Sequence, residues 1–133
     1  MAQTVFDSLD ELQAAVGRHL GISDWLEITP DCLDRFATAT GDRDHGYLAL
    51  ALTNLFLPEI VEVRGASLGV NYGTGNVRFG TPLQVGCRVR GTAELVACDE
   101  IPGGVQTTIR ITVEVDGADH PACVLDSLSR WLA

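Results

Sequence analysis

The sequence predicts an α+β fold, in which a curved antiparallel sheet wraps around a central apolar helix. Three observations lead to this fold class. The N-terminal part contains helices with recognisable caps, residues 47–57 are apolar on nearly every side, and from Glu62 onward the hydrophobic period changes to two. A helix that is apolar all round should be enclosed by protein, and antiparallel strands with one dry face can enclose it. Because the chain contains no repeat or linker, we expect residues 1–133 to form a single domain.

Composition and charge exclude several classes of function. Apolar residues make up 46% of the chain, and its net charge is −9. An acidic surface repels phosphate groups, so neither nucleic acid nor an anionic membrane is the expected partner. No apolar run approaches the about 20 residues that cross a bilayer, and the polar, acidic residues 1–10 do not resemble a secretory signal. We therefore expect a cytoplasmic protein.

The basic and sulfur-containing residues exclude further types of catalytic and metal-binding site. All nine basic residues are arginine, which excludes a lysine Schiff base. The four cysteines include no C-x-x-C pair, and this argues against a zinc knuckle or a thioredoxin-type motif. We expect four reduced thiols, no metal and no cofactor.

The first expected helix begins at a capping box. The Ser8 hydroxyl can accept from the Glu11 N–H, while the Glu11 side chain can reach back to the start of the helix. Apolar residues then follow at helical spacing as far as Leu20, and Gly21 is a typical helix end. A short extended piece at 24–29 should follow.

Two further helices are expected before the sheet. Thr29 is the N-cap of the first of them, with Pro30 at its first position and Gly41 at its end. The other is the apolar helix at 47–57, which we expect to stop at Pro58 and to be enclosed on all sides.

Alternating apolar and polar residues predict the strands. The first strand carries Leu68, Val70 and Tyr72 on its dry face and ends in a turn at 73–76. The alternation is clearest in the two central strands, where it runs without a break. The expected strands span 66–72, 77–79, 87–95, 105–115 and 122–131.

The order of these elements resembles the hot-dog fold, and several motifs resemble the MaoC-like dehydratase family, the (R)-specific enoyl-CoA hydratases. The resemblance covers nearly the whole chain. The motifs that carry it are Phe-Ala-Thr-Ala-Thr-Gly-Asp at 36–42, His-Gly-Tyr-Leu-Ala-Leu at 45–50, Asn-Tyr-Gly at 71–73, Val-Arg-Phe at 77–79 with Pro82, and Pro-Ala-Cys at 121–123.

The resemblance implies a lyase of fatty acid metabolism that acts on acyl-CoA thioesters. In this family an Asp and a His hold the water that adds to the enoyl group, and a backbone N–H at the start of the central helix polarises the thioester carbonyl. Family members are usually homodimers with active sites at the subunit interface. Carried over by position, the implied residues are Asp42, His45 and Gly46 as catalytic and Tyr47, Asn71 and Arg78 as substrate-binding.

One departure from the family pattern lies inside the expected site. In the family, the catalytic His follows the Asp by roughly five positions, and a further loop leads to a second His before the helix glycine. Here only Arg43 and Asp44 separate Asp42 from His45, so His45 matches the helix-start histidine and the loop with the catalytic His is absent. This predicts a weakened hydratase.

Other interpretations of the same residues stay open. Asp42 can be a solvated cap between two helices, and His45 can serve to anchor a helix end. Asp42, Asp44 and His45 alone rarely complete a metal shell. The alternative to an enzyme is a non-catalytic, or engineered, loop-deleted hot-dog scaffold that dimerises and binds acyl-CoA or another apolar ligand.

Overall fold

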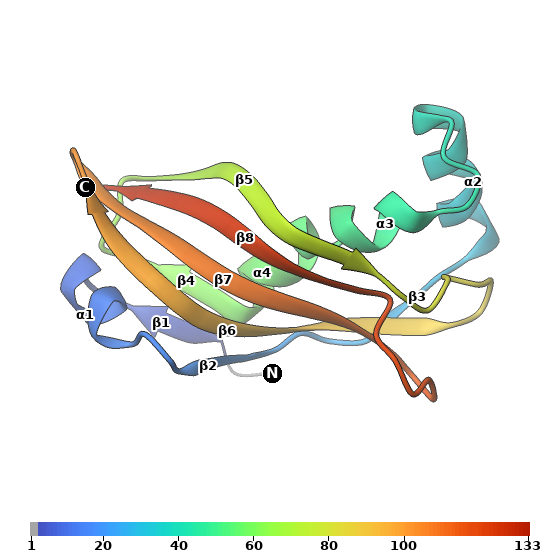
Figure 1. Cartoon of the computed structure of the whole chain (residues 1–133), viewed down its shortest axis with the longest axis horizontal. Helices are drawn as coiled ribbons and strands as arrows, with labels where there is room; N and C mark the ends of the chain where they lie inside the picture. The colour runs from blue at the N-terminus through green and yellow to red at the C-terminus, as the bar shows by residue number, and fades with distance from the viewer. Residues whose placement is uncertain (1–2) are drawn as a thin grey trace.

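The computed structural model describes residues 3–133, so the first two residues of the expected acidic N-terminus lie outside it (Figure 1). Strands β2, β6, β7, β8 and β5 lie in this order in one antiparallel sheet, β3 pairs with β6, and β1 pairs with β4. The elements are β1 (Thr4–Phe6), α1 (Leu9–Ala14), β2 (His19–Ile22), β3 (Leu26–Glu27), α2 (Pro30–Thr40), α3 (Gly46–Ala51), α4 (Thr53–Ile60), β4 (Val61–Val63), β5 (Leu68–Phe79), β6 (Arg88–Ile101), β7 (Gly104–Val115) and β8 (Cys123–Leu132).

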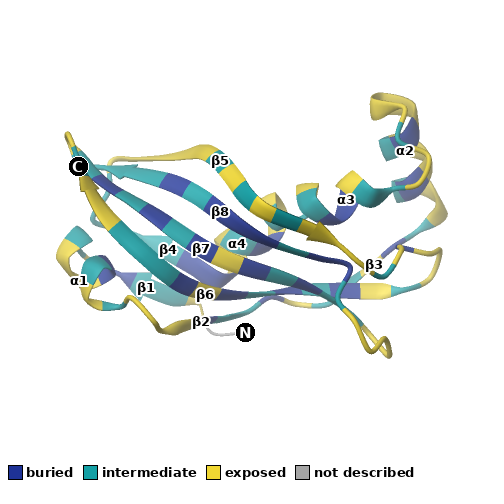
Figure 2. Ribbon diagram, viewed as in Figure 1, coloured by how far each residue is buried: buried dark blue, intermediate teal, exposed yellow. Residues whose placement is uncertain are grey.

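The three long strands β6, β7 and β8 form the centre of the sheet, and their inner face carries most of the core. The alternation predicted for β6 and β7 is confirmed, because Val89, Ala93 and Leu95 lie opposite Val115, Ile111 and Ile109 and are buried. Figure 2 shows the resulting bands of buried and less buried residues along these strands. One apolar core therefore joins the sheet to the helices.

The central helix consists of α3 and α4, which Leu52 joins in a right-handed helical conformation. The prediction that Pro58 ends it is wrong, since α4 continues to Ile60. Burial of Phe56 and Ile60 holds the last turn on the sheet although Pro58 lacks an N–H. The Gln3 side chain also donates to the Pro58 carbonyl over 2.6 Å. Within residues 3–133 no helix has the length and apolar character of a membrane span.

The helix is not enclosed within one chain, contrary to expectation. The sheet covers one side of it (Figure 1), and Tyr47 and Leu55 on the open side keep 62% and 49% of their surface exposed. The sheet is too open at the β5 edge to close around both sides. An apolar helix face is thus left available for another surface.

The first helix is shorter than its apolar spacing predicted. It starts at the predicted capping box, with the Ser8 hydroxyl accepting from the Glu11 N–H over 3.1 Å, but it ends at Ala14. Gly17 has a φ of 92° and donates to the Leu95 carbonyl, so the chain turns into β2 and Leu20 lies in a strand. Pairing with β6 has overridden the local helical pattern.

The second helix agrees with prediction. The Thr29 hydroxyl accepts from the Cys32 N–H over 3.1 Å, Pro30 is the first helical residue, and Gly41 ends the helix with a φ of 76°.

Strand β5 differs from its prediction in two ways. The expected turn at 73–76 is part of the strand, which stays paired with β8 through two irregularities in register. Its faces are also inverted, because Leu68 and Val70 lie outward with 53% and 37% of their surface exposed. The Trp131 ring lies across Gly69 on the inner face, where a Cβ would come within 2.8 Å of it. In this half of the strand, small and polar residues such as Gly69 and Asn71 therefore face the helix.

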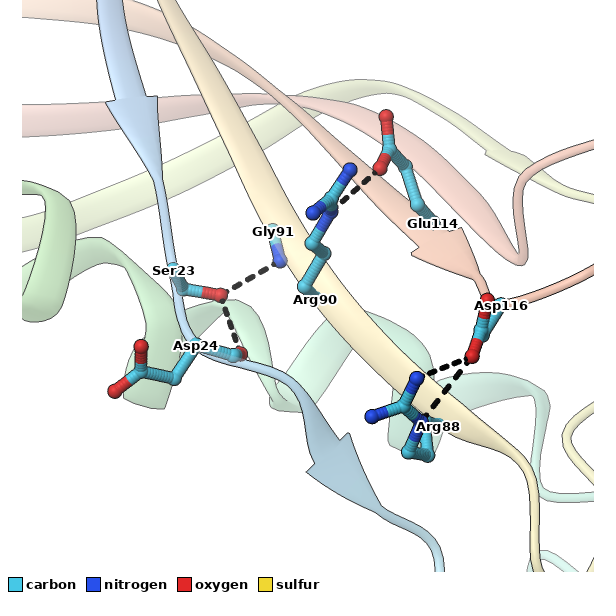
Figure 3. Close-up of polar contacts among 7 residues, drawn as sticks. All are labelled: Ser23, Asp24, Arg88, Arg90, Gly91, Glu114 and Asp116. Carbon is cyan, nitrogen blue, oxygen red and sulfur yellow. Dashed lines mark hydrogen bonds and ion pairs between the residues drawn. The ribbon is translucent and has the colours of Figure 1, made fainter. Parts of the chain in front are cut away.

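A close contact seats α4 on the sheet. Phe56 lies directly over Gly91 of β6, and a Cβ at Gly91 would lie 2.9 Å from the Phe56 Cβ. The Gly91 N–H is buried and donates to the Ser23 hydroxyl over 2.9 Å, at the place where the chain leaves β2 (Figure 3). The missing side chain thus sets how closely the helix approaches the sheet.

We expect Gly91→Ala to lower the free energy of unfolding by about 1–3 kcal/mol, because the added methyl group overpacks the Phe56 contact. Chemical denaturation monitored by circular dichroism measures the change. Gly73→Ala is the matched control, since a Cβ at Gly73 meets nothing within 4 Å. Equal stability of the two variants would contradict the proposed seating of α4.

Candidate functional site

The Asp42 carboxylate caps the start of the central helix. One of its oxygens accepts from the backbone N–H groups of Asp44 and His45 over 3.2 and 3.1 Å, and the other accepts from that of Tyr47 over 3.0 Å. The Asp42 N–H in turn donates to the Thr40 hydroxyl over 3.1 Å. A carboxylate at this end of a helix is favoured both by hydrogen bonding and by the helix dipole.

His45 and Gly46 form the turn between the cap and the helix. His45 has a φ of 59°, a left-handed conformation that is uncommon for a residue with a side chain, and its imidazole makes no capping hydrogen bond. Gly46 is the first residue of α3, and a Cβ built on it would meet no atom within 4 Å. Its N–H belongs to the set that a helix cannot satisfy internally. The space that a side chain at position 46 would take is therefore open, at a residue whose N–H has no partner within the helix.

The predicted substrate-binding residues lie in three different places. The Tyr47 ring is exposed at the first turn of α3 and packs edge-on against Phe79, with 5.4 Å between ring centroids. Asn71 lies further along the inner face of β5. Arg78 lies on the outer face, opposite Val124. The structure thus brings Tyr47 next to Asp42 and turns Arg78 away from both.

Arg78 instead borders a charged network on the outer face of the sheet. Asp126 is nearly buried there, and it accepts from Arg110 over 3.0 Å and from Asn76 over 2.9 Å. The hydrogen bond from Arg110 is the largest cause that lowers the pKa of the Asp126 carboxyl, and the bond from Asn76 adds to it. Both carboxylate oxygens of Asp126 are engaged, so this network links side chains of β5, β7 and β8 across the outer face of the sheet.

The polar lining of a cavity on the inner face was not predicted. The cavity has a volume of about 220 Å³ and lies between α4 and strands β5 and β8. Its inner residues include Ser127 and Ser129, which occupy buried positions opposite Ile109 and Thr107. Two serines at dry positions of an alternating strand were the signal in the sequence that could have indicated it.

The arrangement determines what chemistry is available. The carboxylate that could take a proton from water and the Tyr47 N–H that could polarise a carbonyl are bound to each other. The Gly46 N–H is not among the donors to Asp42, so the cap leaves this donor unused. Among residues 3–133, no group of three or more His, Cys, Asp or Glu side chains is arranged to hold a metal ion.

Comparison with known proteins gives relatives over almost the full chain. No family model matches the sequence. The chain is 38% identical to 3-hydroxyacyl-thioester dehydratase Z of Mycobacterium tuberculosis, with 96% of this chain and 98% of that protein covered. It is 30% identical to nodulation protein N of Rhizobium leguminosarum bv. viciae, with 86% and 85% covered. The alignment with the dehydratase spans 148 positions, more than the 133 residues of this chain.

Solved structures agree in fold at low sequence identity. The monoamine oxidase regulatory protein from Archaeoglobus superposes with a TM-score of 0.73 at 13% identity over 99% of this chain and 98% of that one. The R-hydratase PhaJ1 from Pseudomonas aeruginosa gives 0.65 at 17% identity over 96% and 86%, and the MaoC-like dehydratase from Rhodospirillum rubrum gives 0.63 at 13% over 90% and 94%. These likenesses confirm the predicted hot-dog fold. Together with the near full-length relationship to the mycobacterial dehydratase, they show that the chain belongs to the MaoC-like dehydratase family.

Proposed function

We propose that this chain is an (R)-specific hydratase, which interconverts enoyl and 3-hydroxyacyl thioesters such as those of CoA. The observation that carries the proposal is the 38% identity to a protein named 3-hydroxyacyl-thioester dehydratase over nearly all of both chains. In the hydration direction, the water oxygen bonds to C3 of the enoyl group, one proton of the water leaves with a general base, and a proton is added at C2. The reverse sequence is the dehydration.

The proposed general base is Asp42, and the proposed proton donor is His45. Only two residues separate them, and the Asp42 carboxylate already accepts from the His45 N–H, so both side chains start from one short turn. The proposed donor to the thioester carbonyl is the Gly46 N–H, since the helix dipole stabilises the negative charge that develops on that oxygen. For a second donor to become free, Asp42 must release the Tyr47 N–H.

We expect the activity to be weak. The turn between Asp42 and the helix is too short to hold a separate catalytic histidine at the family position. The length of the alignment supports this interpretation, because the mycobacterial relative has residues that this chain lacks. A positioned acid–base group contributes on the order of 10²–10⁴ in rate, and His45 supplies only part of this from its place at the helix start.

A non-catalytic scaffold is the second candidate, and the Asp42 cap favours it. A carboxylate that accepts three backbone N–H groups is stabilised where it is, and its release to serve as a base costs those hydrogen bonds. In that case the chain keeps the fold and the cavity and binds an acyl thioester without converting it.

We also propose that the protein is a homodimer, and we retain the cytoplasm as its predicted location. Strand β5 is an edge strand of 12 residues, and a long edge strand tends to pair with another chain. Exposed Leu68, Val70 and Tyr72 on this strand add apolar surface to the same edge. Pairing there would also bring a second chain towards the open side of the central helix.

The enzyme proposal is tested by the loss of trans-2-enoyl-CoA absorbance with purified protein. We expect a measurable wild-type rate that Asp42→Asn and His45→Asn each lower by about 10²-fold or more. Asparagine at position 45 tolerates the left-handed backbone and so removes the imidazole without added strain. Asp44→Asn is the matched control, since its side chain lies exposed beside the cap. A wild-type rate equal to that of buffer would leave the scaffold as the explanation.

Gly46→Ala separates stability from activity at the same helix start. We expect it to raise the free energy of unfolding by about 0.5–1 kcal/mol, because alanine is the better helix residue and its methyl group meets open space. We expect kcat/KM to fall, because that methyl group occupies the space through which a carbonyl oxygen would reach the Gly46 N–H. Thermal unfolding and the same absorbance assay measure the two effects. A stabilised variant with unchanged kcat/KM would remove Gly46 from the proposed site.

The dimer is tested by light scattering with size-exclusion chromatography. We expect wild-type protein to have twice the chain mass of 14.2 kDa. Val70→Lys should shift it towards the monomer, because a charge on an edge strand opposes pairing and lies beside Arg130. Val85→Lys is the matched control, since Val85 is an exposed valine outside the strands. A monomeric wild-type protein at high concentration would refute the dimer.

A further inference from the structure

The cavity between the central helix and the β5 edge is lined by several hydrogen-bonding side chains. It lies on the face of the sheet that otherwise carries the apolar core. Its apolar lining residues are Leu57, Pro58, Val70 and Trp131. The side chains with hydrogen-bonding groups around it are Thr53, Asn54, Asn71, Thr74, Ser127 and Ser129.

The two serines form the deep side of this cavity. Ser127 and Ser129 are 9% and 7% exposed and are neighbours on the inner face of β8. Within residues 3–133, neither hydroxyl pairs with another protein group, yet no polar side-chain atom there is both sealed from solvent and unpaired. Their hydroxyl groups therefore open into the cavity. An apolar group placed against these two hydroxyl groups would displace the water that hydrates them and leave them without a hydrogen-bond partner.

The far wall of the cavity is rigid. The Trp131 indole N–H donates to the Thr107 hydroxyl over 2.9 Å, and Thr107 is fully buried. The same ring lies against Gly69, where even a methyl group would not fit. The hydrogen bond to Thr107 and the contact with Gly69 hold the Trp131 ring in place, so it cannot readily move aside for a longer ligand.

The cavity is placed to receive the distal part of an acyl group. It begins at Thr53, seven residues after Gly46, and a rise of 1.5 Å per helical residue puts it about 10 Å from the start of α3. A thioester carbonyl at the Gly46 N–H has its reacting C2 and C3 next to the helix start. The cavity lies beyond those carbons, so it would hold the far end of the acyl chain.

We infer that this enzyme prefers acyl groups whose distal part carries a hydrogen-bonding substituent, such as a hydroxyl group, over plain alkyl chains of equal length. This inference rests on the proposed hydratase function. The substituent would replace water at Ser127 and Ser129, whereas a plain chain would leave both hydroxyls unpaired. A site with polar groups for a hydroxyl discriminates against the analogue that lacks it.

The test compares trans-2-octenoyl-CoA with its ω-hydroxy analogue in the hydration assay. We expect kcat/KM to be about tenfold higher for the hydroxylated substrate, the equivalent of one good hydrogen bond. The double variant Ser127→Ala with Ser129→Ala should abolish or reverse that preference. Thr112→Ala is the control, because it removes a hydroxyl from the outer face of the neighbouring strand. Equal or higher kcat/KM for the plain substrate with wild-type protein overturns the inference, whether or not the double variant folds.

A binding measurement separates this inference from the proposed reaction. Octanoyl-CoA and ω-hydroxyoctanoyl-CoA are titrated into the wild-type protein by calorimetry, which needs no turnover. Absence of hydration with about tenfold tighter binding of the hydroxylated thioester would overturn the hydratase and sustain the polar acyl site. Equal affinities, tighter binding of octanoyl-CoA, or no binding of either thioester would overturn the polar acyl site itself.

Discussion

The contact between Phe56 and Gly91 is the constraint on which the rest of the arrangement depends. It sets the depth at which α4 lies on the sheet, since only a residue without a side chain permits that approach. The position of α4 fixes α3 through Leu52, and α3 carries the Asp42 cap and the open space at Gly46. The same depth leaves the cavity between α4 and β8 at about 220 Å³. One missing methyl group thus positions both the candidate catalytic turn and the candidate acyl site.

Stability and chemistry compete at the start of this helix. The Asp42 carboxylate stabilises the start of α3 by accepting from the N–H groups of His45 and Tyr47. Catalysis would need that carboxylate as a base and at least one helix-terminal N–H as a donor. Gly46 partly resolves the conflict, because its N–H is not among the donors to Asp42 and a side chain is missing beside it. The free energy needed to release the Asp42 carboxylate from its three backbone hydrogen bonds therefore distinguishes a weak hydratase from a binding scaffold.

Local chemistry made part of the fold predictable, and distant contacts decided the rest. The caps at Ser8 and Thr29 depend on residues within one helical turn, so their prediction succeeded. The end of the first helix depends on Leu95, which is far away in sequence and draws residues 17–22 into the sheet. The inverted faces of β5 follow in the same way from Trp131, whose ring takes the space beside Gly69. Periodicity predicted strand at 66–72 and 77–79, but it could not tell that the residues between them stay paired with β8 or which face a distant ring would occupy.

The same distinction between local and distant contacts applies to the residues of the candidate site. The grouping of Asp42, His45 and Gly46 follows from their adjacency in the chain. Asn71 and Arg78 are separated because residues 73–76, expected as a turn, continue the strand, so that Asn71 lies opposite Ser129 on the inner face and Arg78 opposite Val124 on the outer face. The polar lining of the cavity escaped prediction because its residues come from three separate segments. Ser127 and Ser129 nevertheless break the apolar alternation of a strand whose partners Ile109 and Thr107 are buried. The Thr107 hydroxyl has the Trp131 indole N–H as its partner, whereas the two serine hydroxyls have no partner within residues 3–133, and recognition of a polar ligand supplies a reason for their position.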